Sequence, residues 1–259
     1  VQYVLLALAV SLVLAAGLDQ VAQFLAEDQL FYLPAQLVDG KGSDHLEIAG
    51  AVNAAEWRIR EVFNQDAGSS LYFVDPEERR TAIEKVDWVE SAAVSRIWPD
   101  RIFVRITERS PVAFVDKAGT ASGTQPVLLV DANGVLLRSP ARPGVRYELP
   151  VLRGIDNKQT LEERAHRVER MQVLLAALGE HSQNISEIDV TDPRNLVFVY
   201  TDGGSPVQLH IGDRNFAARF DMFRHYRSQI LSDQPDACGF DLRNDGWVVV
   251  NRRGEACVR

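Results

Sequence analysis

The sequence has few cysteines and histidines, and they do not occur in the spacing of a metal site. Among 259 residues there are two cysteines and five histidines. The cysteines do not form a CxxC pair, and no two histidines show the HxH, HxxxH or HExxH spacing of common zinc sites. We therefore expect no metal site.

The two cysteines, Cys238 and Cys257, lie close enough in sequence to close a short loop. An oxidising compartment favours a disulfide between them. The bond requires Cα atoms within about 7 Å of each other, and the turn between the cysteines does not by itself provide this. A disulfide and two separate thiols therefore both remain open.

Motifs of catalysis and of cofactor binding are also missing. The sequence contains no GxSxG, GxxxxGK[ST] or GxGxxG motif, which excludes three common arrangements for nucleophiles and phosphates. The carboxylate pairs Glu77–Glu78 and Glu162–Glu163 fall in the first turns of predicted helices, where the helix dipole favours negative charge. We expect no catalytic residues and no cofactor, and we expect that the protein is not an enzyme.

Positive charge is missing from the N-terminal segment. Val1–Leu18 has no charged side chain, and no Lys or Arg precedes Lys41. Roughly 20 apolar residues cross a bilayer, so we expect a transmembrane anchor over residues 1–26 and a connector over residues 27–43. A cleaved signal sequence is the alternative, because Leu14–Gly17 provides small residues near a suitable cleavage point.

The same lack of Lys and Arg predicts the orientation of the chain. A flank without basic residues belongs outside the cytoplasm by the positive-inside rule, so the C-terminal region is expected to be extracytoplasmic. Because the sequence begins with Val1 and not with Met, we expect a cytoplasmic segment to precede it.

The rest of the chain has the composition of a folded protein. Hydrophobic residues make up 46% and charged residues 25%, as in globular domains, and the length leaves room for two domains. The formal net charge is −8. This balance argues against a nucleic-acid partner, because phosphate binding requires clustered Lys and Arg.

Residues 44–110 are predicted to form a small domain with the order strand, helix, helix, strand, strand. The first strand covers His45–Ile48, and Asn53 with Glu56 is predicted to form a capping box for a helix that ends at Gly68.

A second helix is predicted to begin at its cap Asp75 and to run to about Val86. Trp88–Trp98 and Arg101–Glu108 are then predicted to pair as antiparallel strands, with Trp98 opposite Arg101. One face of this hairpin is expected to cover the helices. That face would carry Ala93, Ile97, Ile102, Val104 and Ile106.

Residues 111–259 show a different rhythm of short strands and turns. A hairpin is predicted around Ala132–Gly134, a loop over Ser139–Gly144, and a helix that begins with a capping box of Thr160 and Glu163. The predicted elements that follow are strands over Ile185–Val190, Leu196–Thr201 and Val207–Ile211, a helix from about Arg214, and a terminal hairpin of Gly239–Leu242 and Trp247–Asn251.

The expected fold class is α+β. It consists of an N-terminal transmembrane helix, a small βααββ domain, and a mixed β domain with two or more helices.

Two stretches of the sequence resemble a known family. They are Gly68–Asp75, which reads GSSLYFVD, and Val86–Ala113, which reads VDWVESAAVSRIWPDRIFVRITERSPVA. They are similar to the bacterial cell-division family FtsQ, called DivIB in some lineages. The pattern of that family in this region is a glycine, an aromatic residue and an Asp before a helix, followed by PWV..A.V.R.WP..L.V.V.ER.PVA. The sequence departs from this pattern at Asp87, where Pro is usual. Weaker matches are Leu129–Gly134, Leu149–Gly154 and Asp241–Arg243.

The resemblance implies a single-pass protein of the inner (cytoplasmic) membrane, located at the division septum, with its N-terminus in the cytoplasm and its C-terminal region in the periplasm. Residues 44–110 would be a polypeptide-transport-associated (POTRA) domain and residues 111–259 an FtsQ-type β domain. The implied function is that of a divisome scaffold without catalysis that links early and late division proteins. The POTRA domain would contact other division proteins, and the last strands of the β domain would bind the FtsB–FtsL pair.

Such binding is expected to occur by addition of a partner strand to a sheet edge, for which Trp247–Asn251 is suited by its three consecutive valines and its lack of Pro. The resemblance implies that Arg243 pairs with a carboxylate of the partner and, more weakly, that Arg194 is a second basic position. Asn244 stands where the family usually has Tyr, which shifts aromatic anchoring to Trp247. The expected partner-binding residues are Arg194, Arg243, Asn244, Trp247, Val248, Val249, Val250 and Asn251.

Three alternatives remain. The terminal segment can be an ordinary hairpin with a solvated Arg and a core Trp. The protein can be a POTRA-containing translocation or outer-membrane assembly component, although only one such unit and no set of membrane strands is present. A cell-envelope hydrolase would require a nucleophile with a base or a metal cluster, and neither pattern occurs.

Overall fold

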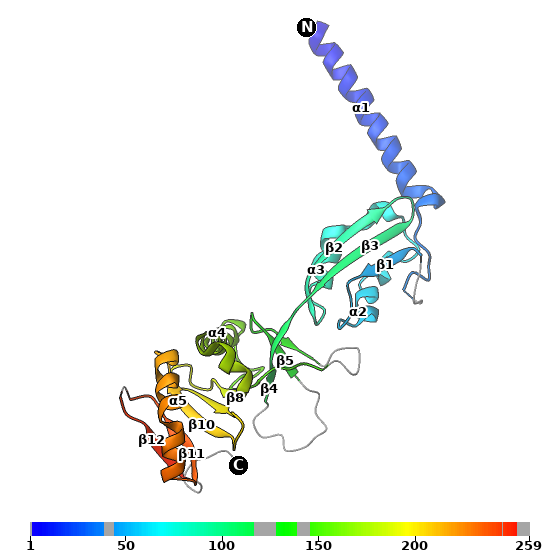
Figure 1. The fold of residues 1–259 in the computed structure, drawn as a ribbon. Helices are drawn as coiled ribbons and strands as arrows, with labels where there is room; N and C mark the ends of the chain where they lie inside the picture. Colours follow the sequence, from blue (N-terminus) through cyan, green and yellow to red (C-terminus); the bar gives the residue numbers. More distant parts are fainter. Residues whose placement is uncertain (1, 39–43, 117–127, 139–145, 245, 253–259) are drawn as a thin grey trace. The chain divides into compact units, whose positions relative to one another are not determined.

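The computed structural model describes residues 2–38, 44–116, 128–138, 146–244 and 246–252. The Cα positions divide the chain into two compact units, Val1–Arg109 and, from Ser110 onwards, Ser110–Ser139 with Gly144–Arg259. An apolar helix leads into the first unit, and the second is rich in strands and carries two long helices (Figure 1). The predicted α+β class is confirmed.

The first unit has the predicted order of strands and helices. Its elements are α1 (Gln2–Glu27), η1 (Gln29–Phe31), β1 (Leu46–Ala49), α2 (Glu56–Glu61), η2 (Asn64–Asp66), η3 (Leu71–Phe73), α3 (Pro76–Ile83), β2 (Val89–Ile97) and β3 (Arg101–Glu108). The sheet order is β1-β3-β2, with β1 parallel and β2 antiparallel to β3.

Helix α1 is long and apolar enough to cross a membrane. The 18-residue window Val10–Glu27 has a mean hydropathy of 1.3, and none of it is buried. The segment after α1 is packed into the first unit, because Leu33 and Leu37 are buried and Leu33 N donates a 2.8 Å hydrogen bond to Ser69 O. This part of the expected connector is therefore folded, while residues 39–43 lie outside the described residues.

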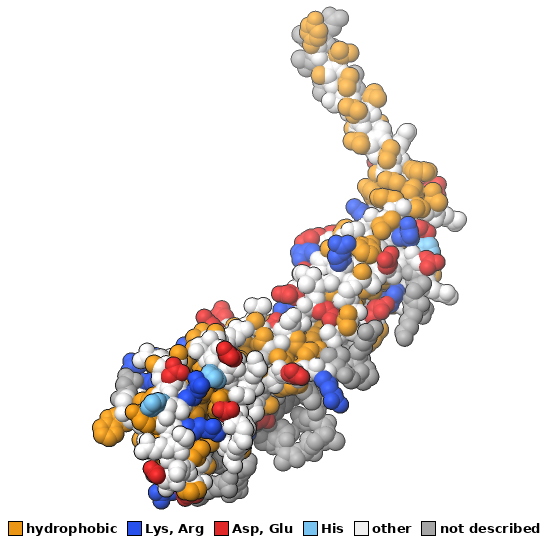
Figure 2. Space-filling model, in the orientation of Figure 1, with side chains coloured by type: hydrophobic (Ala, Val, Ile, Leu, Met, Phe, Trp, Pro, Cys, Tyr) orange, Lys and Arg blue, Asp and Glu red, His pale blue; other side chains and the backbone are white. Residues whose placement is uncertain are grey.

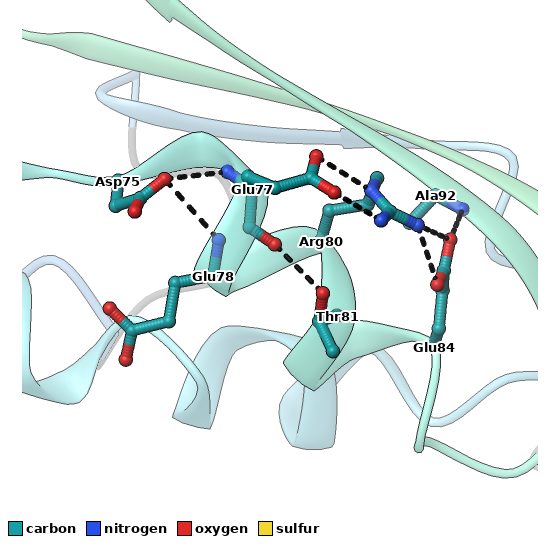
Figure 3. Close-up of polar contacts among 7 residues, drawn as sticks. All are labelled: Asp75, Glu77, Glu78, Arg80, Thr81, Glu84 and Ala92. Carbon is teal, nitrogen blue, oxygen red and sulfur yellow. Dashed lines mark hydrogen bonds and ion pairs between the residues drawn. The ribbon is translucent and has the colours of Figure 1, made fainter.

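The start of α3 is the predicted one. Asp75 accepts hydrogen bonds from the backbone N–H groups of Glu77 (2.9 Å) and Glu78 (3.3 Å) (Figure 3). Pro76 occupies the first turn. The helix ends at Ile83 and not near Val86.

Arg80 then ties α3 together and to the sheet. Its guanidinium pairs with Glu77 and, at 2.7 Å, with Glu84, and Glu84 accepts a 3.4 Å hydrogen bond from Ala92 N in β2 (Figure 3). The hydrogen bonds from Arg80 lower the pKa of Glu77, because they favour the carboxylate.

The capping box predicted at Asn53 and Glu56 is wrong. The helix cap is Ala55, which makes no side-chain cap hydrogen bond, whereas Asn53 Nδ2 donates to Glu108 Oε2 at 2.9 Å. Glu108 Oε1 also accepts from the backbone N–H groups of residues 52–54 at 2.6 to 2.7 Å. The Glu108 carboxylate at the end of β3 thus accepts the Asn53 N–H group that the local pattern assigned to Glu56.

The predicted extent of α2 is also wrong, because α2 ends at Glu61 and not at Gly68. The chain continues as the short η2, in which Asp66 is buried. Arg79 of α3 donates to both carboxylate oxygens of Asp66, at 2.7 and 2.9 Å. This buried ion pair fixes the backbone where the continued helix was expected.

The strands β2 and β3 pair one residue away from the predicted register. Ile97, and not Trp98, lies opposite Arg101, because a three-residue loop joins the strands. A shift by one residue exchanges the two faces, so Ile97 is 37% exposed. The apolar face consists of Ile102, Val104 and Ile106 with their partners Ala92 and Val94.

The second unit is a nine-stranded sheet with two helices. Its elements are β4 (Pro111–Val115), β5 (Leu128–Asp131), β6 (Leu136–Leu137), β7 (Val151–Arg153), α4 (Leu161–Leu178), η4 (Gly179–Asn184), β8 (Ile185–Asp189), β9 (Leu196–Tyr200), β10 (Val207–Gly212), α5 (Phe216–Asp233), β11 (Ala237–Asp241) and β12 (Val249–Arg252). The strand order is β12-β11-β10-β9-β8-β7-β4-β5-β6.

Both long helices pack into one hydrophobic core with the sheet. This core includes Met171 and Leu174 of α4, Phe220 and Phe223 of α5, and Phe240 of β11. Strand β12 lies at one end of the order of the described strands.

The local predictions for this unit are largely confirmed. Thr160 and Glu163 form the capping box of α4, and β5 and β6 form a hairpin in which Gly134 has a φ of +77°. Helix α5 begins at Phe216, two residues after the predicted start. The predicted loop Ser139–Gly144 lies outside the described residues.

Candidate partner-binding edge

The terminal hairpin forms one end of the large sheet. β11 pairs in parallel with β10 after the crossover through α5, and β12 pairs antiparallel with β11. Among the described strands none pairs with the other edge of β12. The predicted hairpin is confirmed, although its second strand begins at Val249, two residues later than expected.

Side chains along this segment alternate between the core and solvent. Val248 and Val250 pack against the hydrophobic core, whereas Trp247 is 76% and Val249 is 48% exposed. The alternative of a core Trp at this position is therefore wrong. Asn251 lies opposite Gly239, where an added Cβ would come within 3.3 Å of the Asn251 Cβ.

Arg243 already has a carboxylate partner in its own chain. Its Nε lies 2.9 Å from Asp241 Oδ1 and 3.1 Å from Oδ2. These hydrogen bonds lower the pKa of Asp241, because they favour its charged form. A carboxylate of a partner would have to share this guanidinium, so the role predicted for Arg243 stays a prediction.

The other polar residues predicted for the site lie near this corner. Arg194 is solvent-exposed, with Nε 3.7 Å from Asp192 Oδ1, and the adjacent Asn195 accepts a 3.4 Å hydrogen bond from Arg243 Nη1. Asn244 is exposed, and its carbonyl accepts a 3.2 Å hydrogen bond from Trp247 N. The structure thus brings the loop before β9 to the end of β11.

A buried cation that the sequence did not reveal holds the hairpin to α5. Arg219 is 5% exposed, and its two terminal nitrogens donate to Ile211 O and Arg243 O, each at 2.7 Å. The contact fixes the chain between β11 and β12. It links three segments distant in sequence, so no spacing rule could have identified it.

His210 is a second residue that the sequence reading missed. It lies beside Asp241 in the parallel pairing of β10 and β11, and Asp241 in turn lies opposite Val249. Burial lowers the pKa of His210, and the Asp241 carboxylate partly opposes this effect. The order strand, helix, strand around α5 was the one signal for this parallel pairing.

Cys238 of β11 is buried and disulfide-bonded. Cys257 lies outside the described residues. In the described part of the chain there is no group of three His, Cys, Asp or Glu side chains able to hold a metal ion.

Two family models match the chain. The model described as "POTRA domain, FtsQ-type" matches residues 43–109, and the model "Cell division protein FtsQ/DivIB, C-terminal" matches residues 121–243. The second match ends at Arg243, so β12 follows it.

Curated relatives of the chain carry the name of the same family. "Cell division protein FtsQ" of Koribacter versatilis (strain Ellin345) is 36% identical over 215 residues, which cover 82% of this chain and 60% of the relative. The protein of the same name in Anaeromyxobacter sp. (strain K) is 30% identical over 175 residues, which cover 65% of this chain and 56% of the relative. The chain thus spans less than two thirds of the length of these two relatives.

Among solved structures, the major extracytoplasmic domain of the trans isomer of DivIB from Geobacillus stearothermophilus matches 49% of this chain and 94% of that chain. The sequence identity is 22% and the TM-score is 0.27, a likeness too weak for a statement about the fold.

Proposed function

Because the chain belongs to the FtsQ/DivIB family of bacterial cell-division proteins, we propose that it is a membrane-anchored scaffold of the division machinery. Helix α1 would hold it in the inner membrane with both folded units outside the cytoplasm, and the edge of β12 would bind the FtsB–FtsL pair. The role is one of binding and not of catalysis.

The observation that carries this proposal is the position of β12. It is the last strand at one end of the order of the described strands, and the edge strand of a sheet can add a strand from another chain. Trp247, just before β12, and Val249, its first residue, have exposed side chains, while Val248 and Val250 pack against the core. Backbone hydrogen bonds would supply affinity, and the outward side chains would supply specificity.

The charges near the edge support a polar rim for such an interface. Arg243 and Asp241 pair at the end of β11, and Arg194 is almost fully exposed in the loop before β9. Exposed charges at the rim of an interface affect partner choice and association rate more than affinity. We therefore assign the main part of the binding energy to the strand and to Trp247.

The test is capture of the FtsB–FtsL pair from the same organism by the full chain in detergent or nanodiscs. The variants are Trp247→Ala and Val249→Lys, with Val173→Lys as the matched control, because Val173 on α4 is 45% exposed. Each change at the edge is expected to weaken binding about tenfold or more, whereas the control should bind as the parent does.

Each outcome has a distinct meaning. Equal binding by all variants would move the interface away from β12 and leave the scaffold function intact. Failure of the folded parent chain to bind an intact pair would contradict the proposed partner and favour a role in polypeptide translocation.

Membrane anchoring is tested separately. The full chain should float with lipid vesicles and resist extraction at alkaline pH, and in cells added protease should reach the folded units only after the outer membrane is opened. Release of the chain at alkaline pH, or digestion only after lysis of the inner membrane, would contradict the proposed topology.

A further inference from the structure

Exposed aromatic and apolar side chains gather where α1 meets the first unit. We call this group the collar. Its members and their exposed fractions are Phe24 54%, Leu30 60%, Tyr32 40%, Tyr72 37%, Phe73 64% and Trp98 44%. Figure 2 shows hydrophobic side chains massed at this junction, continuous with those of α1.

The collar is assembled from segments far apart in the sequence. Phe31 is buried between Phe24 and Trp98, and its ring makes edge contacts with both at centroid distances of 5.5 Å. Ser70 Oγ donates a 2.6 Å hydrogen bond to Leu25 O at the end of α1. These contacts fasten the helix end to the first unit, so the collar has a fixed place relative to α1.

The remaining members are attached to the same framework. Tyr32 forms a β-bridge with Ser70, next to Tyr72 and Phe73, whose rings contact each other. Arg96 links the two sides, because its guanidinium donates to Tyr72 O at 2.9 Å and lies 5.9 Å from the Trp98 ring. The collar is therefore one continuous surface.

The chemistry of this surface matches the interfacial layer of a bilayer. A contiguous exposed apolar patch marks an interaction site, and Trp and Tyr prefer the membrane–water boundary, where an apolar ring and a polar tip are both satisfied. Arg96 adds a cation within reach of lipid phosphates. The nearby Asp28 carboxylate is occupied in capping η1, where it accepts from Leu30 N at 2.8 Å.

The position along α1 is also suitable. Asp19 is the first charged residue of the helix, and Phe24 follows it by about 7.5 Å along the axis at a rise of 1.5 Å per residue. The headgroup layer on each side of the hydrocarbon is about 5 to 7.5 Å thick. Helical side chains lean toward the N-terminus, so the Phe24 side chain leans toward the part of α1 that would cross the bilayer.

We propose that the collar rests on the outer surface of the lipid bilayer and holds the first unit against it, in place of a free tether. This inference rests on the proposed insertion of α1. It commits the surface to lipid, because the collar continues the apolar surface of the helix that would cross the membrane.

The native tryptophans provide the test. Trp98 belongs to the collar, whereas Trp57, 62% exposed, follows the loop bound by Glu108 at the other end of β3. At about 3.3 Å per residue, β3 separates the two ends by roughly 23 Å. Of these two tryptophans, only Trp98 should therefore reach the lipid.

The full chain is reconstituted into vesicles of phosphatidylglycerol and phosphatidylcholine brominated near the head of the acyl chains, and quenching of tryptophan emission is measured. We expect Trp98→Phe to lose most of the quenching and Trp57→Phe to retain it. In the Trp98→Phe background, Phe73→Trp should restore quenching, whereas Val52→Trp, at the far loop, should not.

Flotation of the vesicles tests the insertion of α1 separately from the contact of the collar with lipid. A chain that does not float with the vesicles would contradict the insertion of α1. A chain that floats but shows equal quenching in the Trp98→Phe and Trp57→Phe variants, without recovery by Phe73→Trp, would overturn the collar proposal alone.

Discussion

Replacement of Arg219 by Met is expected to loosen the attachment of the terminal hairpin. Arg219 is 5% exposed and donates to two backbone carbonyls, Ile211 O and Arg243 O, each at 2.7 Å. A hydrogen bond from a charged group contributes about 1.5 to 3 kcal/mol. Met keeps much of the apolar stem of the side chain but leaves both carbonyls without these donors.

Two such losses, reduced by water that reaches the part-buried Arg243 carbonyl, give an expected destabilisation of about 3 kcal/mol. Arg219→Lys should fall between the parent and Arg219→Met, because one ammonium on a flexible stem is a poor substitute for the two-pronged guanidinium. The matched control on the same helix is Arg224→Met. Arg224 is 46% exposed and lies 3.8 Å from Asp221, and an exposed pair of this kind contributes little.

The assay is native-state hydrogen exchange of the full chain. Amides of β10 and β11 should lose protection in Arg219→Met by the amount given above, while amides of β1 and β3 in the first unit should not change. A loss in β10 and β11 of less than about 1 kcal/mol, equal to that of Arg224→Met, would refute the assigned role.

Three further predictions concern single residues. Glu108→Gln should destabilise the first unit by about 1 to 2 kcal/mol in hydrogen exchange, because a neutral oxygen accepts the N–H groups of residues 52–54 more weakly than a carboxylate does. Unchanged protection of the loop over residues 52–54 would contradict this role of Glu108. Gly134→Ala should cost about 2 kcal/mol or more in urea unfolding, because the residue has a φ of +77° and its Cβ would lie 2.4 Å from Ala165 N; a neutral effect would contradict the close approach. The pKa of His210 in the folded chain lies below its ordinary value of 6.5. As the pH falls below 6.5, the unfolded chain therefore binds a proton at His210 more readily than the folded chain does. The contribution of neutral His210 to folding stability is complete above pH 6.5 and is lost as the pH falls through the folded pKa. His210→Gln should flatten the decline in stability over this range, and an unchanged decline would exclude His210 as its source.

The sequence predicted those features that depend on neighbours along the chain. Asp75 caps α3 because its carboxylate reaches N–H groups two and three residues later, and Thr160 with Glu163 does the same for α4. The apolar run of α1 is visible for the same reason, since hydropathy is read directly from consecutive residues. The exposed Trp247 and Val249 alternate with half-buried neighbours, as a strand requires.

The predictions that were wrong concern places where groups distant in the sequence compete for one hydrogen-bond donor or one position. Asn53 satisfied the pattern of a capping box, but a carboxylate more than fifty residues away binds it instead. The register of β2 and β3 depended on how many residues the turn takes up, and a shift by one residue exchanges the faces of a strand.

The sequence by itself determined the elements of this protein: an apolar N-terminal helix, the caps of α3 and α4, and a family pattern across both units. Only the tertiary structure decided that β12 lies at the sheet edge, that Arg219 secures it, and that the collar gathers around the end of α1. The physical reason is one of range. Helix caps and hydropathy act over a few residues, whereas edge positions, buried cations and composite surfaces exist only after segments far apart in the chain have packed together.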